Sequence, residues 1–273
     1  MKPAKNPRQL LLPRRALLKT VGTAVALAPL VSLLGCGGST GAGTSDSTDG
    51  TWEGASGTWA TGGTASMSGN YADPFTEGLG STCALYKAST LGPCHALTVE
   101  RMDLSEGQAG LPVRLAFLVV NASCQPMPGA TVELWHANPS GLYSGSDAAN
   151  MCTNGNAAAR AARYFRGIQT ADANGRVDFN TCFPGWYSSR SVHIHFTVRV
   201  GGTEYLTSQL FFDDALNNEI IASQPLYGTR GAKDTANAND KVIKESSLSN
   251  HLFQAKQLED GALLAWKTLV VHA

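Results

Sequence analysis

Residues 111–135 read LPVRLAFLVVNASCQPMPGATVELW, and this stretch decides the fold. Its first part contains an almost continuous apolar run over residues 113–120, which predicts a strand. Residues 131–135 alternate between polar and apolar side chains, which predicts a second strand. The prolines and the glycine of PMPG, residues 126–129, are typical of a turn. We therefore expect two strands joined by a short connection.

The same signals continue towards the C-terminus. An ANGR tetrapeptide predicts a hairpin-type turn before a strand over residues 177–179. Residues 192–200 alternate, two glycines turn the chain, and residues 204–212 return. Short strands separated by turns predict a mostly β domain, an antiparallel sandwich or barrel. Helical signals are few and are limited to residues 156–162 and 214–222.

The composition excludes one class of function. The chain has 273 residues, of which 43% are hydrophobic, and its 21 Lys and Arg balance 21 Asp and Glu. This length holds one full-sized domain and little more. Because there is no excess of basic residues, the chain lacks the electrostatic footprint that holds a nucleic-acid backbone. We therefore expect no nucleic-acid partner.

Residues 1–36 carry the features of an export signal. A basic flank precedes an apolar run over residues 21–34, which is shorter than the roughly 20 residues of a membrane-spanning helix. Arg14 and Arg15 resemble a twin-arginine signal, although adjacent arginines also occur in ordinary signal peptides. The segment LLGC ends at Cys36 and resembles a bacterial lipobox, in which the cysteine is acylated. We expect an exported protein of the periplasm or cell surface that meets the membrane only through this N-terminal lipid or signal.

Residues 37–80 are predicted to be a flexible linker. Residues 37–69 are almost wholly Gly, Ser and Thr, with Trp52 and Trp59 as isolated exceptions. Such a composition cannot bury enough apolar area to offset the entropy lost on ordering. The β-rich domain then occupies residues 81–273.

Five further cysteines follow the lipobox, and in an exported protein they are candidates for disulfide bonds. None has the CxxC spacing of a zinc or redox site, so we interpret them as structural. Sequence alone does not fix the connectivity, and an odd number leaves one cysteine unpaired. The preferred pairs are Cys83 with Cys94 and Cys152 with Cys182, and Cys124 is the remaining candidate.

The residues that carry chemistry gather in PGWYSSRSVHIH, residues 184–195. His193 and His195 lie two positions apart on a predicted strand, so they point to the same face at about 7 Å along the backbone, close enough to share a metal ion. An HxH pair by itself is also found where histidines are merely packed or exposed. Upstream, WHANPSGLYSG, residues 135–145, ends a strand and delivers a tyrosine into a loop.

These two segments resemble the intradiol ring-cleavage dioxygenases, the family that includes catechol 1,2-dioxygenase and protocatechuate 3,4-dioxygenase. The resemblance covers most of residues 113–240. It also includes YFRGIQTAD at residues 164–172, LTSQLFF at residues 206–212 and NAND at residues 237–240. No single motif is decisive, but their joint occurrence in this order is specific. One departure is LGPC at residues 91–94, where the resemblance would place an aromatic residue near the substrate mouth, so the size and charge of the substrate stay open.

The resemblance implies a prealbumin-like β-sandwich and one mononuclear, non-haem Fe(III) ion as the cofactor. By position, its ligands fall on two tyrosines and two histidines, which are Tyr143, Tyr187, His193 and His195. Phenolate is a hard, charged donor that suits Fe(III) better than Fe(II). The metal must lower a tyrosine pKa of about 10 before the phenolate can bind.

The implied reaction is the O₂-dependent cleavage of a catechol ring between its two hydroxylated carbons, which yields a cis,cis-muconate-type diacid. The catechol would bind as a chelating dianion and displace Tyr187 from the metal. Arg190 matches a family arginine that stabilises charge developing on the ring, because a guanidinium stays charged. Gln209 matches a glutamine beside the site. The expected partners are a catechol-type aromatic substrate and O₂.

Ordinary roles stay open for each residue taken singly. A tyrosine at a strand end needs no metal, and Arg190 could be a surface charge. Residues 111–198 also resemble prealbumin-like or carboxypeptidase-regulatory sandwiches, which often serve as non-catalytic binding modules on cell surfaces. The dioxygenase and binding-module hypotheses agree on the fold. They diverge at Tyr143, Arg190, His193 and His195, which a bare module has no reason to keep together.

Overall fold

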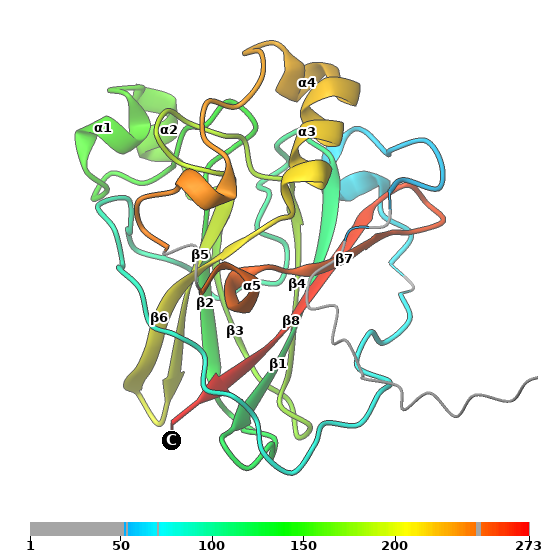
Figure 1. Cartoon of the computed structure of the whole chain (residues 1–273). Coiled ribbons are helices and arrows are strands. Elements are labelled where there is room, and N and C mark those ends of the chain that lie inside the picture. Colours follow the sequence, from blue (N-terminus) through cyan, green and yellow to red (C-terminus); the bar gives the residue numbers. More distant parts are fainter. Residues whose placement is uncertain (1–51, 53, 70, 244–246, 273) are drawn as a thin grey trace, which may run out of the picture. The chain divides into compact units, whose positions relative to one another are not determined.

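Figure 1 shows the computed structural model, which describes residues 52, 54–69, 71–243 and 247–272. These residues belong to one compact unit, residues 46–273. The predicted export signal with Cys36 and the first part of the predicted linker lie outside the described residues. Within the described ranges, every helix falls short of the length and apolar character that a membrane span requires.

The described residues form two four-stranded sheets. The first has the strand order β4 (Arg176–Cys182), β1 (Pro112–Asn121), β8 (Leu263–Val271) and β7 (Gln254–Gln257). The second has the order β3 (Arg166–Thr170), β2 (Thr131–Trp135), β5 (His193–Val200) and β6 (Thr203–Phe211). Neighbouring strands are antiparallel except β1 and β8, which run parallel. The predicted mostly β sandwich is confirmed, with one parallel pair that the sequence did not predict.

The core lies between the sheets. Buried side chains of both sheets form one cluster, which includes Phe117 of β1 and Leu134 and Phe196 of the second sheet. The rings of Phe117 and Phe179, on the paired strands β1 and β4, lie 6.2 Å apart between centroids. β1 has a partner on each side and most of its residues are buried. This burial explains why its apolar residues run without strict alternation.

Helices are few and short, as predicted. α2 (Ala157–Ala161) and α3 (Asp214–Ser223) lie where the helical signals were found. Asp213 caps α3, because its carboxylate accepts the Ala215 backbone N–H at 2.7 Å. The described residues also contain short helices that were not predicted, namely α1 (Asn150–Thr153), α4 (Pro225–Gly228), α5 (Leu248–His251), η1 (Gly63–Ser66) and η2 (Asn237–Asn239).

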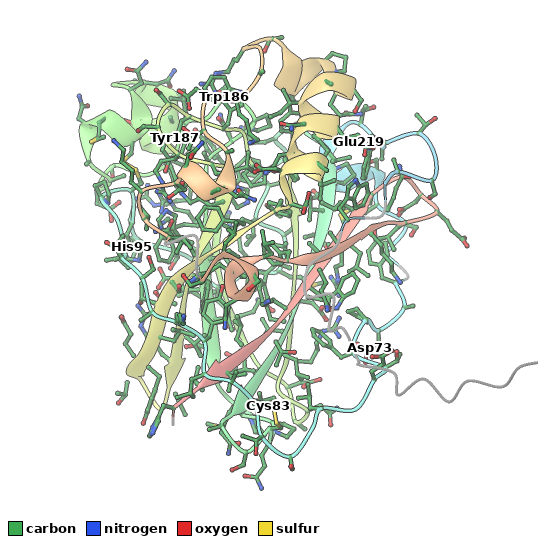
Figure 2. All side chains as sticks on the ribbon, in the orientation of Figure 1. Asp73, Cys83, His95, Trp186, Tyr187 and Glu219 are labelled. Atoms are coloured by element: carbon green, nitrogen blue, oxygen red, sulfur yellow. A yellow bond between two sulfur atoms is a disulfide. The ribbon has the colours of Figure 1, made fainter. Side chains whose placement is uncertain are left out.

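Part of the segment predicted as a linker, residues 37–80, belongs to the folded domain. Trp59 is 6% exposed and joins the core cluster, and Trp52 packs against the same cluster. Their stacked rings lie 5.6 Å apart. Each indole N–H donates at 3.0 Å to a different carboxylate oxygen of Glu219, which is labelled on α3 in Figure 2. Trp52 and Trp59 are therefore packed against the β-rich domain and are not isolated residues of a flexible segment. The two tryptophans supply apolar area that an averaged composition hides.

The disulfide bonds differ from the preferred pairing. Cys83 bonds to Cys124, and Cys94 bonds to Cys152. Cys182, at the end of β4, is a free and buried thiol among the described residues, and burial raises its pKa to about 12. The predicted pairs Cys83 with Cys94 and Cys152 with Cys182 were wrong. The packing of distant segments, rather than spacing along the chain, decides which sulfurs come within bonding distance.

Candidate metal centre

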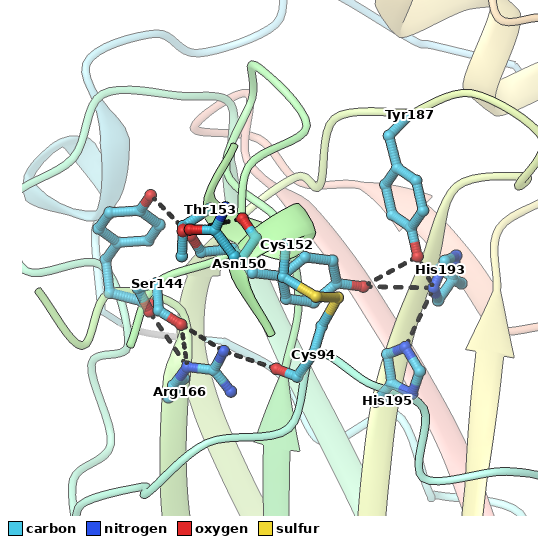
Figure 3. The surroundings of a disulfide bond; sticks show 11 residues. Cys94, Ser144, Asn150, Cys152, Thr153, Arg166, Tyr187, His193 and His195 are labelled. Atoms are coloured by element: carbon cyan, nitrogen blue, oxygen red, sulfur yellow. Dashed lines mark hydrogen bonds between the residues drawn. A yellow bond between two sulfur atoms is a disulfide. The ribbon is translucent and has the colours of Figure 1, made fainter. Parts of the chain in front are cut away.

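The four residues predicted as metal ligands meet at one end of the second sheet. Figure 3 labels three of them, Tyr187, His193 and His195. His193 Nε2 lies 3.0 Å from Tyr187 Oη and 3.3 Å from Tyr143 Oη. It lies 3.2 Å from His195 Nε2, and the two phenol oxygens are 3.3 Å apart. Three separate segments of the chain thus place two oxygen and two nitrogen donors around one point.

β5 carries both histidines on one face, as the strand alternation predicted. Strand pairing places His195 opposite Trp135 of β2 and Gln209 of β6. The Nδ1 of His193 donates to the Ser191 carbonyl at 2.7 Å, so its Nε2 keeps a free lone pair that faces the phenols. The His195 ring instead stacks on Trp135, with centroids 5.0 Å apart and planes inclined by 14°. Each imidazole is therefore held by a different kind of contact.

The two tyrosines come from loops and differ in burial. Tyr143 lies in the loop after β2 and is 2% exposed, and its backbone N–H donates to the Cys152 carbonyl at 2.9 Å. Tyr187 lies in a tight turn between β4 and β5, in which the Arg190 N–H donates to the Tyr187 carbonyl at 3.2 Å. Ser189 in this turn has a positive φ of 66°. The Tyr187 side chain is half-buried, so Tyr143 is the more enclosed of the two.

Burial favours the neutral form of all four side chains. It lowers the pKa of His193 to about 3 and that of His195 well below its usual value, and the positive charge of Arg190 acts in the same direction. It also raises the pKa of Tyr143 well above 10 and raises that of Tyr187. Neutral imidazole is the form that binds a metal. A bound cation would reverse the preference of the phenols, because it stabilises phenolate.

The donor set fits a single metal ion. Metal bonds of about 2.0–2.2 Å to nitrogen and oxygen place neighbouring donors roughly 2.8–3.5 Å apart, and the donors here are 3.0–3.3 Å apart. Over the described ranges, no three His, Cys, Asp or Glu side chains gather as a metal site. The site instead combines phenols with imidazoles, and phenolate oxygen with imidazole nitrogen suits an iron ion.

Arg190 and Gln209, the other predicted site residues, form one hydrogen-bonded group beside the donors. Arg190 Nη2 donates to Gln209 Oε1 at 2.5 Å, and Gln209 Nε2 donates to the Thr90 carbonyl at 3.2 Å. Arg190 Nε also donates to Asp240 Oδ2 at 2.9 Å. Burial opposes the ionisation of Asp240, but Arg190 and hydrogen bonds outweigh it and lower the pKa of this carboxyl. Asp240 was not predicted as a site residue, although it ends the NAND motif.

The chain is similar to known dioxygenases over much of the described domain. A family model described as Dioxygenase matches residues 85–258. Catechol 1,2-dioxygenase 1 of Acinetobacter lwoffii is 26% identical over 150 residues, which cover 48% of this chain and 45% of that relative. Chlorocatechol 1,2-dioxygenase of Pseudomonas putida is 30% identical over 105 residues, which cover 32% of this chain and 36% of that relative. The chain thus spans less than half the length of either relative.

Solved structures show the same fold. An intradiol ring-cleavage dioxygenase from Tetranychus urticae superimposes with a TM-score of 0.62 at 24% identity, over 70% of this chain and 95% of that chain. The dioxygenase domain of a carbohydrate-binding fusion protein from Streptomyces sp. SirexAA-E gives a TM-score of 0.51 at 21% identity, over 70% of this chain and 99% of that chain.

Proposed function

The chain belongs to the intradiol ring-cleavage dioxygenases, a family of non-haem iron enzymes, and from this premise we propose that it cleaves a catechol-type ring between the two hydroxylated carbons. O₂ is the oxidant, and both of its atoms enter a cis,cis-muconate-type diacid. One observation carries the proposal. Two phenol oxygens and two imidazole nitrogens meet with 3.0–3.3 Å between neighbouring donors.

We propose that these donors hold one Fe(III) ion, through Tyr143, Tyr187, His193 and His195. When bound, the ion would supply the positive charge and electron exchange that make the ring reactive towards O₂. The lowered pKa values of both histidines support this assignment, because neutral imidazoles are ready to bind. The ferric charge would favour deprotonation of both phenols despite burial, and the two phenolates would offset part of that charge.

Tyr187 is the ligand proposed to give way to the substrate. Its side chain is half-buried, whereas Tyr143 is 2% exposed and its backbone is held by Cys152. A phenolate at Tyr187 that moved aside would be able to take up a proton from one catechol hydroxyl. Burial raises the pKa of Tyr187, so the protonated phenol is the stable form once this side chain has left the cation.

Arg190 is proposed to stabilise negative charge that develops on the ring. Its guanidinium is fixed from two sides, by the ion pair with Asp240 at 2.9 Å and by the hydrogen bond to Gln209 at 2.5 Å. A charge that is already oriented needs no reorganisation during the reaction, which is why such groups lower barriers. Asp240 and Gln209 are therefore positioning residues for Arg190.

We also propose that the enzyme works outside the cytoplasm, anchored by a lipid at Cys36. The bonds Cys83–Cys124 and Cys94–Cys152 support an oxidising compartment. Mass spectrometry of the N-terminal peptide from the membrane fraction tests the anchor. An acylated Cys36 is expected, and a chain recovered from the cytoplasm with all thiols reduced would contradict the proposal.

The activity is tested by oxygen uptake and product analysis with iron-loaded protein. Catechol, protocatechuate, hydroxyquinol and substituted catechols are supplied in turn with isotopically labelled O₂. We expect equimolar uptake of O₂ for at least one of them and a diacid that carries both labelled atoms. Iron-loaded protein that consumes O₂ with none of these substrates would favour a non-catalytic binding module.

A further inference from the structure

The disulfide between Cys94 and Cys152 lies beside the candidate metal centre (Figure 3). Its Cys152 half reaches the buried tyrosine, because the Cys152 carbonyl accepts the Tyr143 backbone N–H at 2.9 Å. Its Cys94 half is linked through Arg166 to Ser144, the residue that follows Tyr143. The Nη2 of Arg166 donates to the Cys94 carbonyl at 2.7 Å, and its Nε donates to the Ser144 carbonyl at 3.0 Å. Both halves therefore attach to the backbone that carries Tyr143.

The segment just before the disulfide covers one of the histidines. Gly92 has a φ of +75°, and a Cβ at this position would lie 3.1 Å from Cε1 of His195. The neighbouring Pro93 carbonyl accepts the Ala149 backbone N–H at 3.2 Å, at the start of α1. The disulfide thus joins the loop over His195 to the loop of the buried tyrosine.

Arg166 strengthens the same link. Its side chain is fully buried, and burial lowers the pKa of the guanidinium to about 10. Its hydrogen bonds go to the backbone carbonyls of Cys94 and Ser144 and to the Ser144 hydroxyl, rather than to a carboxylate. A guanidinium used in this way bridges two loops, because its planar fork can donate to both at once.

The tyrosine loop has limited packing of its own. The disulfide lies in a small apolar cluster separate from the core between the sheets, and apart from Tyr143 and Trp135 of β2 the buried members of this cluster are alanines and the two cysteines. Such small side chains bury little apolar area. The loop also contains α1 (Asn150–Thr153) and α2 (Ala157–Ala161), and helices this short are not stable alone. A covalent bond here has a large share in fixing the loop.

We infer that the Cys94–Cys152 disulfide is a positioning element of the metal centre, an inference that rests on the proposed function. The bond holds the loop over His195 against the loop that carries Tyr143, so that these two donors keep the positions in which they can bind one ion. The chain with this bond binds Fe(III) tightly, and the chain without it keeps its fold and binds Fe(III) weakly. Removing groups that orient metal ligands typically lowers metal affinity by about 10–100-fold.

The test compares two variants of the purified chain, each of which lacks one of the two disulfide bonds. Cys94→Ala/Cys152→Ala removes the bond at the site, and Cys83→Ala/Cys124→Ala removes the other bond as a matched control. The two bonds close segments with sequence separations of 58 and 41 residues, so their loss gives the unfolded chain similar extra freedom. Dissociation constants for Fe(III) are measured by competition with a chelator, and the tyrosinate-to-Fe(III) absorption band is recorded. Circular dichroism of the iron-free proteins reports the fold.

We expect the site variant to bind Fe(III) at least about tenfold more weakly than the wild type, with a weakened or shifted band, and the control to stay within about threefold. Equal affinities in both variants, whether unchanged or lowered, would overturn the inference. A site variant that fails to fold while the control folds would also overturn it, because the bond would then hold the domain rather than the site. A wild-type chain that binds no iron would instead overturn the proposed function.

Discussion

Replacing Asp240 by asparagine removes the carboxylate that holds Arg190 beside the proposed metal centre. The Asp240 carboxylate accepts hydrogen bonds at 2.9 Å from Arg190 Nε and from the backbone N–H groups of Ser191 and Val242. Its side chain is fully buried, and the Arg190 side chain is 14% exposed. The variant therefore leaves a largely buried positive charge without its counterion.

The expected loss of stability follows from this burial. Removing one partner of a buried ion pair costs about 3–5 kcal/mol. Asparagine keeps one oxygen for the backbone donors and Arg190 keeps some contact with water, so we expect the free energy of unfolding of Asp240→Asn to fall by about 2–3 kcal/mol. For a domain of this size, each kcal/mol lowers the thermal midpoint by about 2–4 °C, which gives a fall of about 4–12 °C. Turnover should fall as well, because Arg190 no longer keeps one orientation, while the four proposed iron ligands are untouched.

Thermal unfolding, iron content and kcat are measured on the same preparations. Asp234→Asn is the matched control, since Asp234 is exposed and accepts a hydrogen bond from the Ser188 hydroxyl at 2.8 Å in the turn that also carries Arg190. This control should change the midpoint little. The reasoning is refuted if Asp240→Asn unfolds at the wild-type midpoint, or if Asp234→Asn falls by as much.

The same carboxyl gives a pH dependence. Burial opposes its ionisation, but Arg190 and the donated hydrogen bonds lower the pKa of Asp240 in the folded chain. A carboxyl of this kind stabilises the fold above its unfolded pKa of about 3.9, and the stabilisation is lost as the pH falls through the folded pKa. The midpoints of the wild type and of Asp240→Asn should therefore converge as the pH falls below about 4.

The remaining predictions concern the ligands, the arginine and the N-terminal tryptophans. His193→Ala and Tyr143→Phe should each lose iron in metal analysis, because each removes one donor. Arg190→Ala should keep the iron and its absorption band and lose most of kcat. Glu219→Ala should leave two indole N–H groups unpaired and lower the free energy of unfolding by about 1–3 kcal/mol in denaturant titrations, with unchanged iron content. Iron retained in His193→Ala or Tyr143→Phe would contradict the role of that residue as a ligand. Full turnover in Arg190→Ala would contradict its role in the reaction, and unchanged stability in Glu219→Ala would contradict its role in anchoring the tryptophans.

Local patterns predicted the strands that carry the site. β2 has the bounds that were predicted, and β1, β5 and β6 differ by no more than one residue at either end. In each of these strands, the order of apolar and polar residues along the chain indicates which side chains are buried. β8 and its parallel pairing with β1 were not predicted. Local sequence patterns do not indicate which strands, far apart in the chain, pair with each other. The anchoring of Trp59 by Glu219 depends on a distant partner in the same way.

The candidate ligands were predicted from motifs, and the structure brings their donor atoms together. Their neighbours were harder to predict. Trp135 lies in a motif that was singled out, but its stacking on His195 follows from the pairing of β2 with β5. Asp240 and the Cys94–Cys152 bond lie beside the candidate site only because distant loops meet there. Long-range contacts of this kind leave no periodic signal in the sequence.

The most direct test is to titrate the purified, iron-free chain with Fe(III) and record its metal content and visible spectrum. We predict one Fe(III) ion per chain and a reddish tyrosinate-to-Fe(III) absorption that Tyr143→Phe and Tyr187→Phe each change. A wild-type chain that stays colourless and binds no stoichiometric iron would contradict the assignment of the four ligands.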